Sequence, residues 1–314
     1  MSLVLSSVRD TLYAVTSCCF PNPTLHINRR TFKVIKLLGE GGFSYVHLVQ
    51  DTSTGRYYAL KKIRCQFGSD SVKDAMKEVD MYRLFSHENI IKVIDTCVVQ
   101  DKNGGKIVYI FLPYYKSGLQ DVINNNLENN KYFSEKEMLK IFRGICYAVR
   151  ALHTYRFPSD GVVPFAHRDI KPGNILLTDD ADSQPILMDF GSLVRARIKI
   201  QTRNEALMQQ DLASQHSTMP YRAPELFDVK TNVELNEKVD IWSLGCTLYA
   251  MAYGSSPFDN NINEQGGSIA LAVLNAQFQF KDLISFMLKV DPKDRPDIHQ
   301  VIAKVDTQLE QLSS

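Results

Sequence analysis

The sequence predicts an α+β fold with a small strand-rich N-terminal part and a larger helical C-terminal part. From Phe32 to Leu112, short runs of Val, Ile, Leu and Tyr alternate with glycine turns, which is the pattern of successive strands. After Gly118 the apolar residues recur at helical spacing instead. The 314 residues contain enough apolar material for one large domain or for two lobes that share an interface.

In the N-terminal part, β-branched and aromatic residues bounded by turn residues predict strands at 32–38, 45–51, 57–63, 90–95 and 107–112. A helix is predicted at 71–85, because Asp74 lies three residues after Ser71, a good N-cap. Residues 1–29 are expected to form an irregular leader, since Pro21 and Pro23 interrupt it.

The C-terminal part is expected to contain several helices. Ser134 and Glu137 form a capping-box pattern that opens a long amphipathic helix. Its apolar face consists of Met138, Ile141, Phe142, Ile145, Val149 and Leu152. The remaining apolar patterns predict helices at 240–253, 269–276, 283–290 and 298–312.

Composition excludes several classes of protein. The 36 basic and 35 acidic side chains nearly cancel, so no nucleic-acid partner is expected. The six cysteines include no C-x-x-C pair, which favours a reduced intracellular setting over a disulfide framework or a zinc site. No apolar run approaches the about 20 residues that span a bilayer. The protein is therefore expected in the cytosol, or held at a membrane from its cytosolic side.

A glycine-rich turn and a lysine suggest phosphate binding. Gly39, Gly41 and Gly42 lie between the first two predicted strands, where glycine lets the backbone approach phosphate oxygens. Such turns are also common between ordinary strands. Lys61 on the third strand is either an edge residue facing solvent or a lysine that Glu78 holds towards phosphate oxygens.

The strongest pattern is the segment His167–Asn174, followed fifteen residues later by Asp189-Phe190-Gly191. Phosphoryl transfer needs hard-oxygen metal ligands, for which Asn174 and Asp189 are suited. It also needs an acceptor that orients the attacking hydroxyl, Asp169, and a cation near the γ-phosphate, Lys171. The alternative, a polar loop near a hairpin, explains neither the order nor the spacing of the two motifs.

With these motifs and Ala223-Pro224-Glu225, the chain resembles a eukaryotic protein kinase from about Phe32 to Leu312. The resemblance implies a two-lobed protein kinase fold over 30–312, with an N-lobe at 30–112, a linker at 113–118 and a C-lobe at 119–312. It implies ATP in the cleft, Mg²⁺ as the metal with Mn²⁺ as a possible substitute, and protein substrates with serine or threonine acceptors.

The resemblance also implies roles for single residues. The ATP-binding residues would be Leu38, Gly39, Gly41, Gly42, Val46, Ala59, Lys61, Leu112 as gatekeeper, Pro113, Tyr114, Tyr115 and Leu176. Lys61, Glu78, Asp169 and Lys171 would be catalytic, and Thr218 would lie against Asp169 and Lys171 at the substrate position. Tyr82, His167 and Phe190 would stack, Glu225 would pair with Arg295, and Asp240 would anchor the catalytic loop.

Four segments narrow the resemblance to the Numb-associated kinase family, in its myristoylated-and-palmitoylated branch. They are Leu38–Val46, Met81–His87, Pro220–Leu226 and Asp240–Met251. Ser44 stands where most kinases have a third glycine, and this replacement is normal in that branch. Lys171 and Thr218 favour serine and threonine over tyrosine as acceptors, and dual specificity stays open.

The leader suggests membrane attachment. Cys18 and Cys19 are adjacent at a terminus, as S-acylated cysteines often are, although a pair of ordinary thiols is the plainer interpretation. Ser2 stands where myristoylation requires glycine. We expect palmitoylation at Cys18, Cys19 or both, and residence on the cytoplasmic face of the Golgi or vacuole with a cytosolic pool.

Three further segments carry expectations. Helix-forming residues over 205–213 predict a helix between Asp189 and Glu225, and our hypothesis is that its packing, more than phosphorylation, orders this activation segment. Arg168 remains available for a phosphate on Thr202, Ser214, Ser217 or Thr218. The stretch 154–166 is expected to be a tolerated surface insertion, and residues 276–281 are short for the family.

Two other functions compete with that of an active, autophosphorylating kinase. A pseudokinase scaffold would bind nucleotide but act through protein contacts, and it usually lacks one of Lys61, Asp169, Asn174 and Asp189, all present here. A nucleotide-binding adapter outside the kinases would have the glycine turn without the catalytic loop.

Overall fold

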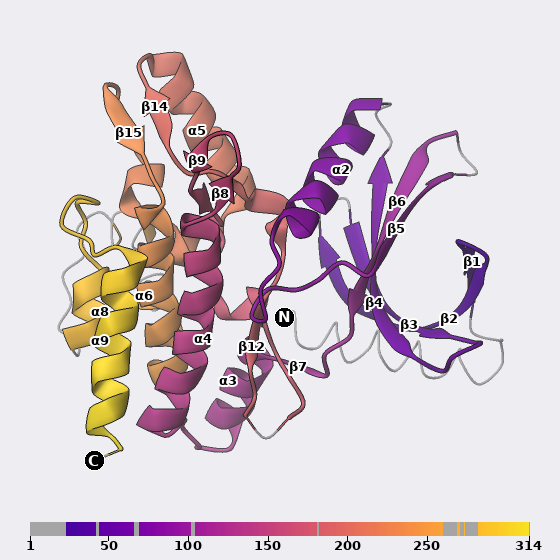
Figure 1. Ribbon diagram of the computed structural model, residues 1–314, viewed down its shortest axis with the longest axis horizontal. Helices are drawn as coiled ribbons and strands as arrows, with labels where there is room; N and C mark the ends of the chain where they lie inside the picture. The colour runs from indigo at the N-terminus through magenta and orange to yellow at the C-terminus, as the bar shows by residue number, and fades with distance from the viewer. Residues whose placement is uncertain are drawn as a thin grey trace. The chain divides into compact units, whose positions relative to one another are not determined.

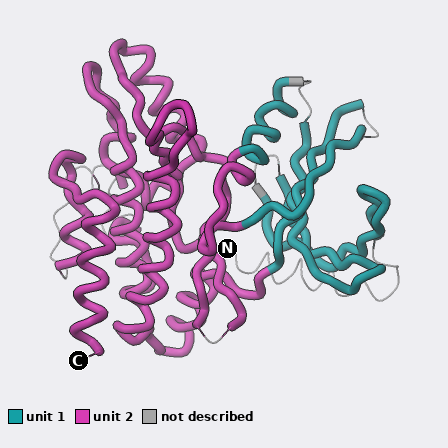
Figure 2. The backbone as a smooth tube through the Cα atoms, viewed as in Figure 1, with its two compact units in different colours: residues 1–80, 92–114 teal, residues 81–91, 115–314 magenta. Residues whose placement is uncertain are grey.

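The computed structural model describes residues 23–41, 44–65, 69–101, 104–180, 182–259, 269–270, 273 and 282–313. They form two compact units (Figure 2). Unit 1 contains the residues up to Asp80 together with 92–114, and unit 2 contains 81–91 together with the residues from Tyr115 onward. Unit 1 is rich in strands and unit 2 in helices (Figure 1), which confirms the predicted α+β class.

Unit 1 contains a six-stranded sheet of order β1-β2-β3-β4-β6-β5 in which all neighbours are antiparallel. The strands are β1 Thr24–Ile27, β2 Arg30–Gly41, β3 Ser44–Asp51, β4 Tyr57–Cys65, β5 Asp95–Gln100 and β6 Lys106–Pro113. The strands predicted at 32–38, 45–51, 57–63 and 107–112 are confirmed, each within a slightly longer element.

The strand predicted at 90–95 is wrong. Ile90 makes only an isolated bridge with Leu187, and the amide of Ile91 donates to the carbonyl of Leu187 at 2.9 Å. Both isoleucines are buried, so their apolar character reflects burial in unit 2 rather than membership of the sheet. The fifth strand starts only at Asp95.

One face of the unit 1 sheet carries a hydrophobic core. Its buried members are Ile27, Phe32, Val34, Val49, Tyr58, Leu60, Ile107, Tyr109 and Phe111. Burying such a side chain stabilises the fold by about 1.5–3 kcal/mol relative to leaving it exposed. The guanidinium of Arg30 lies 5.0 Å from the centroid of the Phe32 ring, and its Nε donates to Asp51 at 2.7 Å.

Helix α2, Ser69–Leu84, follows β4 and crosses the boundary between the units after Asp80. It begins two residues before the predicted cap, so Ser71 lies inside the helix. Asp70 in the first turn and Arg83 in the last have the signs that suit the helix dipole.

Unit 2 is built around helices of six to nineteen residues. They are α3 Leu119–Glu128, α4 Glu135–His153, α5 Arg203–His216, α6 Lys238–Tyr253, α8 Asp282–Met287 and α9 Ile298–Gln311. Helix α4 packs against α9 and α6, and α6 packs against α8 (Figure 1). As predicted, Ser134 caps α4, its hydroxyl accepting from the amide of Glu137 at 3.2 Å.

The predictions at 240–253, 283–290 and 298–312 correspond to α6, α8 and α9, whereas most of 269–276 lies outside the described residues. Residues 276–281 lie outside them too. The helix predicted within the activation segment is confirmed as α5.

Short strand pairs fix the loops of unit 2. The antiparallel pairs are β7 Ser117–Gly118 with β11 Ile175–Leu177, β11 with β12 Pro185–Leu187, β10 Phe165–Ala166 with β13 Val194–Arg195, β14 Ile198–Ile200 with β15 Val233–Leu235, and β8 Arg156–Phe157 with β9 Gly161–Val162. Helix α4 approaches β12 closely at Gly144, where an added Cβ would lie 2.6 Å from Cγ of Pro185.

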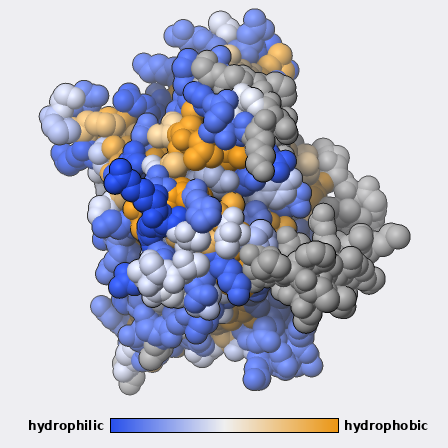
Figure 3. All heavy atoms as spheres, turned by 90° about the vertical axis from the view of Figure 1, so that its right-hand side faces the viewer, coloured by the Kyte–Doolittle hydropathy of each residue, from blue (hydrophilic) through white to orange (hydrophobic). Residues whose placement is uncertain are grey.

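Hydrophilic residues cover much of the surface in the space-filling view, and hydrophobic residues show in patches between them (Figure 3). Among the described residues, no helix combines the length and the apolar character needed to cross a membrane.

Candidate active site

In unit 1, five of the predicted ATP-binding residues share one face of the sheet. Gly39 pairs with Val46, and Val46 pairs with Lys61, across β2, β3 and β4. Ala59 lies two positions before Lys61 and pairs with Leu112 on β6. Because paired antiparallel residues point to the same side, these side chains lie opposite the hydrophobic core.

The other predicted ATP-binding residues of unit 1 lie at the ends of strands or at an irregularity of the sheet. Leu38 sits at a register shift between Leu37 and Gly39 and is 39% exposed. Pro113 ends β6, and the ring of Tyr114 lies 6.5 Å from that of Tyr57. Gly41 ends β2, while Gly42 lies outside the described residues.

Lys61 is held by an ion pair and does not extend into solvent. Its Nζ lies 2.6 Å from Oε1 of Glu78 on α2, with the two side chains 14% and 10% exposed. A poorly hydrated ammonium needs such a partner. The predicted pairing of Lys61 with Glu78 is thus present within unit 1.

In unit 2, three donors converge on the carboxylate of Asp169. Oδ1 accepts from the backbone amide of Thr218 at 2.8 Å. Oδ2 accepts from Nζ of Lys171 and from Nδ2 of Asn174, each at 2.9 Å. Lys171 also donates to the hydroxyl of Thr218. The carboxylate is therefore oriented by two loops, the catalytic loop and the segment before η3 (Met219–Tyr221).

Asn174 and Asp189 are brought together by the backbone. Asn174 ends the 3₁₀ turn η1, Pro172–Asn174, and its carbonyl accepts from the amide of Met188 at 3.0 Å. The next residue, Asp189, has φ 66°, a left-handed conformation that is uncommon for a non-glycine residue. The hydrogen bond between Met188 and Asn174 thus holds the two predicted metal-ligating residues, Asn174 and Asp189, close together along the backbone.

Asp240 on α6 anchors the catalytic loop, as expected. It is fully buried, and its carboxylate accepts from the backbone amides of His167 and Arg168, both at 2.8 Å. It also contacts Nε2 of His153 at 3.0 Å. Burial by itself would raise the pKa of Asp240, but the hydrogen bond and charge of His153 and the amide donors bring it below its usual value.

The expected stack of rings is also present in unit 2. Tyr82 and Phe190 are stacked, with centroids 5.0 Å apart and an interplanar angle of 10°. His167 meets Phe190 edge-on at 5.7 Å, and its Nε2 lies 3.1 Å from the carbonyl of Met188. These contacts fix Phe190 next to Asp189.

The activation segment carries α5, which begins with a reciprocal capping box between Thr202 and Glu205. Gln209 in the middle of this helix accepts a hydrogen bond from Nη1 of Arg168 at 3.0 Å. Further along, Arg222 donates to the hydroxyl and carbonyl of Ser217 at 2.7 and 2.9 Å. These contacts hold the residue that precedes Thr218.

The segment ends at a buried ion pair. Arg295 is fully buried and donates to both carboxylate oxygens of Glu225, at 2.7 and 2.6 Å. Its remaining donors reach the carbonyls of Lys289, Lys238 and Val290. The expected pairing of Glu225 with Arg295 is confirmed.

The predicted site residues are divided between the two units. Unit 1 contains Lys61, Glu78 and most of the predicted ATP-binding residues, and unit 2 contains Asp169, Lys171, Asn174, Asp189, Thr218, Tyr115 and Leu176. Leu176 pairs with Gly118 and Ile186. Cys18 and Cys19 lie outside the described residues.

Sequence reasoning did not identify His153 and Gln209. His153 is an ordinary-looking last-turn histidine of α4, and Gln209 is one of several polar residues on α5. No local pattern distinguishes them, because their roles depend on residues more than 40 positions away in the chain, Asp240 and Arg168.

Comparison with known proteins gives a consistent result. A model of the protein kinase domain matches residues 32–305. Serine/threonine-protein kinase ppk13 of Schizosaccharomyces pombe is 37% identical, over 96% of this chain and 97% of the relative. Serine/threonine-protein kinase 16 of Homo sapiens is 37% identical, over 92% and 94% respectively. Serine/threonine-protein kinase ENV7 of Saccharomyces cerevisiae is 33% identical, over 93% and 96%.

Proposed function

Because the chain belongs to the protein kinase family, among relatives that are serine/threonine kinases, we propose specific roles for its residues in phosphoryl transfer. As a protein serine/threonine kinase it uses ATP with a divalent metal and acts on protein substrates. The finer proposal is that Asp169 orients the acceptor hydroxyl, that Mg²⁺ is the metal, and that the protein phosphorylates itself.

The convergence of donors on Asp169 carries this proposal. Each carboxylate oxygen has two lone pairs, and Oδ1 accepts only the amide of Thr218 among the hydrogen bonds described above. A serine or threonine hydroxyl can donate to the remaining lone pair, which orients its oxygen for attack. Lys171 has three N–H donors, of which two donate to Asp169 and Thr218. The third is available to a phosphate oxygen.

The residues present fit a magnesium ion. Both N–H groups of the Asn174 amide point to Asp169, one to its carbonyl and one to its carboxylate, which leaves the amide oxygen as the free ligand. An amide oxygen and the carboxylate of Asp189 are hard donors that Mg²⁺ prefers. When bound, the ion offsets phosphate charge. In the described part of the chain no three His, Cys, Asp or Glu gather at one point.

Transfer of labelled γ-phosphate, with Mg²⁺, to the protein itself and to a generic basic protein tests the proposal. Asp169→Asn and Lys61→Arg are expected to abolish labelling of serine and threonine. Asp179→Asn is the matched control, because Asp179 is an exposed carboxylate 3.8 Å from Lys116. Absence of label from the unmodified protein, with ATP binding retained, would instead favour a pseudokinase scaffold.

We also propose that the protein belongs to the Numb-associated kinases and is held on the cytoplasmic face of an endomembrane, Golgi or vacuole, with a cytosolic pool. Adjacent Cys18 and Cys19 support this, since two acyl chains anchor a protein stably whereas one does so weakly. Replacing both cysteines by serine should move the protein to the soluble fraction. Retention of that variant in the membrane pellet would contradict the proposal.

A further inference from the structure

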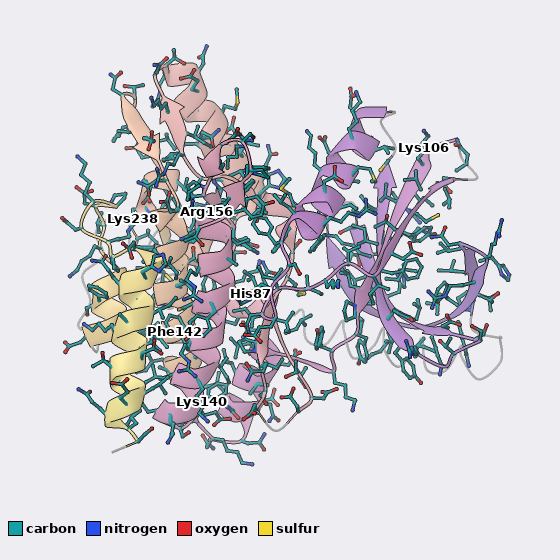
Figure 4. All side chains as sticks on the ribbon, viewed as in Figure 1. His87, Lys106, Lys140, Phe142, Arg156 and Lys238 are labelled. Atoms are coloured by element: carbon teal, nitrogen blue, oxygen red, sulfur yellow. The ribbon has the colours of Figure 1, made fainter. Side chains whose placement is uncertain are left out.

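The segment that follows α4 folds into a hairpin before it reaches the catalytic loop. In β8 and β9, Arg156 pairs with Val162 and Phe157 with Gly161. The amide of Val163 closes the hairpin by donating to the carbonyl of Tyr155 at 2.8 Å. Its turn, 158–161, is exposed, as expected for a surface insertion. Figure 4 labels Arg156, at the end of α4 where the hairpin begins.

The hairpin brings aromatic rings into a cluster that reaches Phe190. Phe157 meets Tyr155 edge-on at 5.0 Å, and Tyr155 meets Phe165 and Phe85 at 5.9 and 5.0 Å. Phe85 in turn meets Phe190 at 5.9 Å with an interplanar angle of 89°. Edge-to-face pairs contribute about 0.5–1.5 kcal/mol each beyond the burial of their area. The hairpin is thus coupled by ring contacts to the residue beside Asp189.

The same hairpin holds the activation segment a few residues further on. The guanidinium of Arg195 lies 5.5 Å from the centroid of the Phe157 ring. Arg195 also pairs with Phe165 between β13 and β10, and the amide of Ala196 donates to the carbonyl of Pro164 at 2.8 Å. Phe157 therefore contacts Arg195 directly. It is linked to Phe190 through the rings of Tyr155 and Phe85.

The residues from Asp189 to Ala196 need contacts of this kind to keep their conformation. Asp189 has φ 66°, and a conformation of this kind persists only where the surrounding structure holds it. Phe190 is fully buried and contacts neighbouring rings, while Arg195 is exposed. A face of Phe157 is the contact that fixes the Arg195 side chain.

We propose that the hairpin 155–162 is a positioning element for catalysis, in which Phe157 holds the activation segment between Phe190 and Arg195. Phe157 contacts neither ATP nor the acceptor in this proposal, and it acts through Arg195, Tyr155 and Phe165. The inference rests on the proposed transfer reaction for its kinetic test only. It replaces the expectation that 154–166 is a tolerated surface insertion.

The test compares Phe157→Ala with Phe157→Tyr, Arg195→Gln and Val162→Ala, measuring kcat, KM for ATP, and hydrogen exchange of the amides of 190–196. Phe157→Ala is expected to lower kcat about fivefold with KM for ATP within about twofold, and to speed exchange at 190–196. Phe157→Tyr should restore both quantities, because it keeps the ring. Arg195→Gln should act in the same direction as Phe157→Ala.

Val162 is the control, since it lies exposed on the same hairpin without a ring contact. Val162→Ala should leave kcat and exchange unchanged. If Phe157→Ala and Arg195→Gln both keep kcat within twofold and exchange at 190–196 unchanged, the hairpin is only a surface loop and the inference is overturned. If Phe157→Ala does not fold, the exposed Arg195→Gln decides. An unmodified protein that transfers no phosphate would refute the proposed function, while exchange would still test the hairpin.

Discussion

Nη1 of Arg168 donates to the side-chain oxygen of Gln209 at 3.0 Å, and both side chains are buried. Burial lowers the pKa of Arg168, opposed by the charge of Asp240, and Nε of Arg168 has no hydrogen-bond partner in the described part of the chain. A neutral amide from α5 thus contacts the arginine that was expected to be available for a phosphate. This contact supports the hypothesis that packing of α5, more than phosphorylation, orders the activation segment.

The first prediction follows from this contact. Protein stripped by a phosphatase should keep its turnover, whereas Gln209→Ala should lower kcat several-fold. Leaving a buried donor without its acceptor costs about 1–3 kcal/mol, and more for a charged group, so α5 should loosen. Steady-state assays before and after treatment measure both effects. Gln215→Ala, at an exposed position of the same helix, should change neither. A collapse of turnover on phosphatase treatment would refute the hypothesis.

Asp240 makes stability depend on pH at the acid end. Its pKa in the folded protein lies below the ordinary 3.8, so its contribution is fully present above about pH 4. The contribution is lost as the pH falls through the lower folded value. Asp240→Asn should reduce the free energy of unfolding by about 3 kcal/mol at pH 7. Denaturant unfolding from pH 7 to 3 should show this difference shrinking towards acid pH.

The matched control for that series is Asp306→Asn. Asp306 lies 3.3 Å from Arg143 in a pair whose side chains are about 40% exposed, and such pairs contribute about 0–1 kcal/mol. An equal loss in both variants at pH 7, or a difference that does not change with pH, would contradict the role given to Asp240.

Thr218 should matter through its hydroxyl. Thr218→Ala removes the oxygen that accepts from Lys171, and a hydrogen bond to a charged group contributes about 1.5–3 kcal/mol. We expect kcat to fall about tenfold or more, with Thr218→Ser close to the unmodified protein. Thr231→Ala, at an exposed position, serves as control. Equal rates for the alanine and serine variants would show that the hydroxyl is not needed.

Arg295 should not tolerate lysine. Its guanidinium spans Glu225 and three backbone carbonyls, a set that one ammonium group cannot reproduce. Arg295→Lys should therefore lower the free energy of unfolding by about 3 kcal/mol, read as a lower Tm. Arg197→Lys is the comparison, because the Arg197 side chain is 59% exposed in its pair with Glu237. Similar Tm values for the two variants would contradict this account.

The local sequence pattern was sufficient to predict those elements whose structure depends mainly on residues near them in the chain. The strand alternation of unit 1, the Ser134 cap and the helical residues of α5 were all predicted, because propensity and capping depend on neighbours in the chain. It failed at Ile90 and Ile91. The apolar residues there contact Leu187, which is distant in the chain. In a short apolar run, the sequence pattern of such a buried segment is the same as that of a buried strand.

The sequence by itself determined the class of fold, the family and the residues with the chemistry for transfer, because those residues occur in short motifs at set spacing. Only the tertiary structure decided what holds them. Gln209 meets Arg168, His153 meets Asp240, and Phe157 meets Arg195 across 41, 87 and 38 positions of chain. Such contacts arise when separate elements pack together, and the residues next to each of them in the sequence do not indicate which distant residue it will contact.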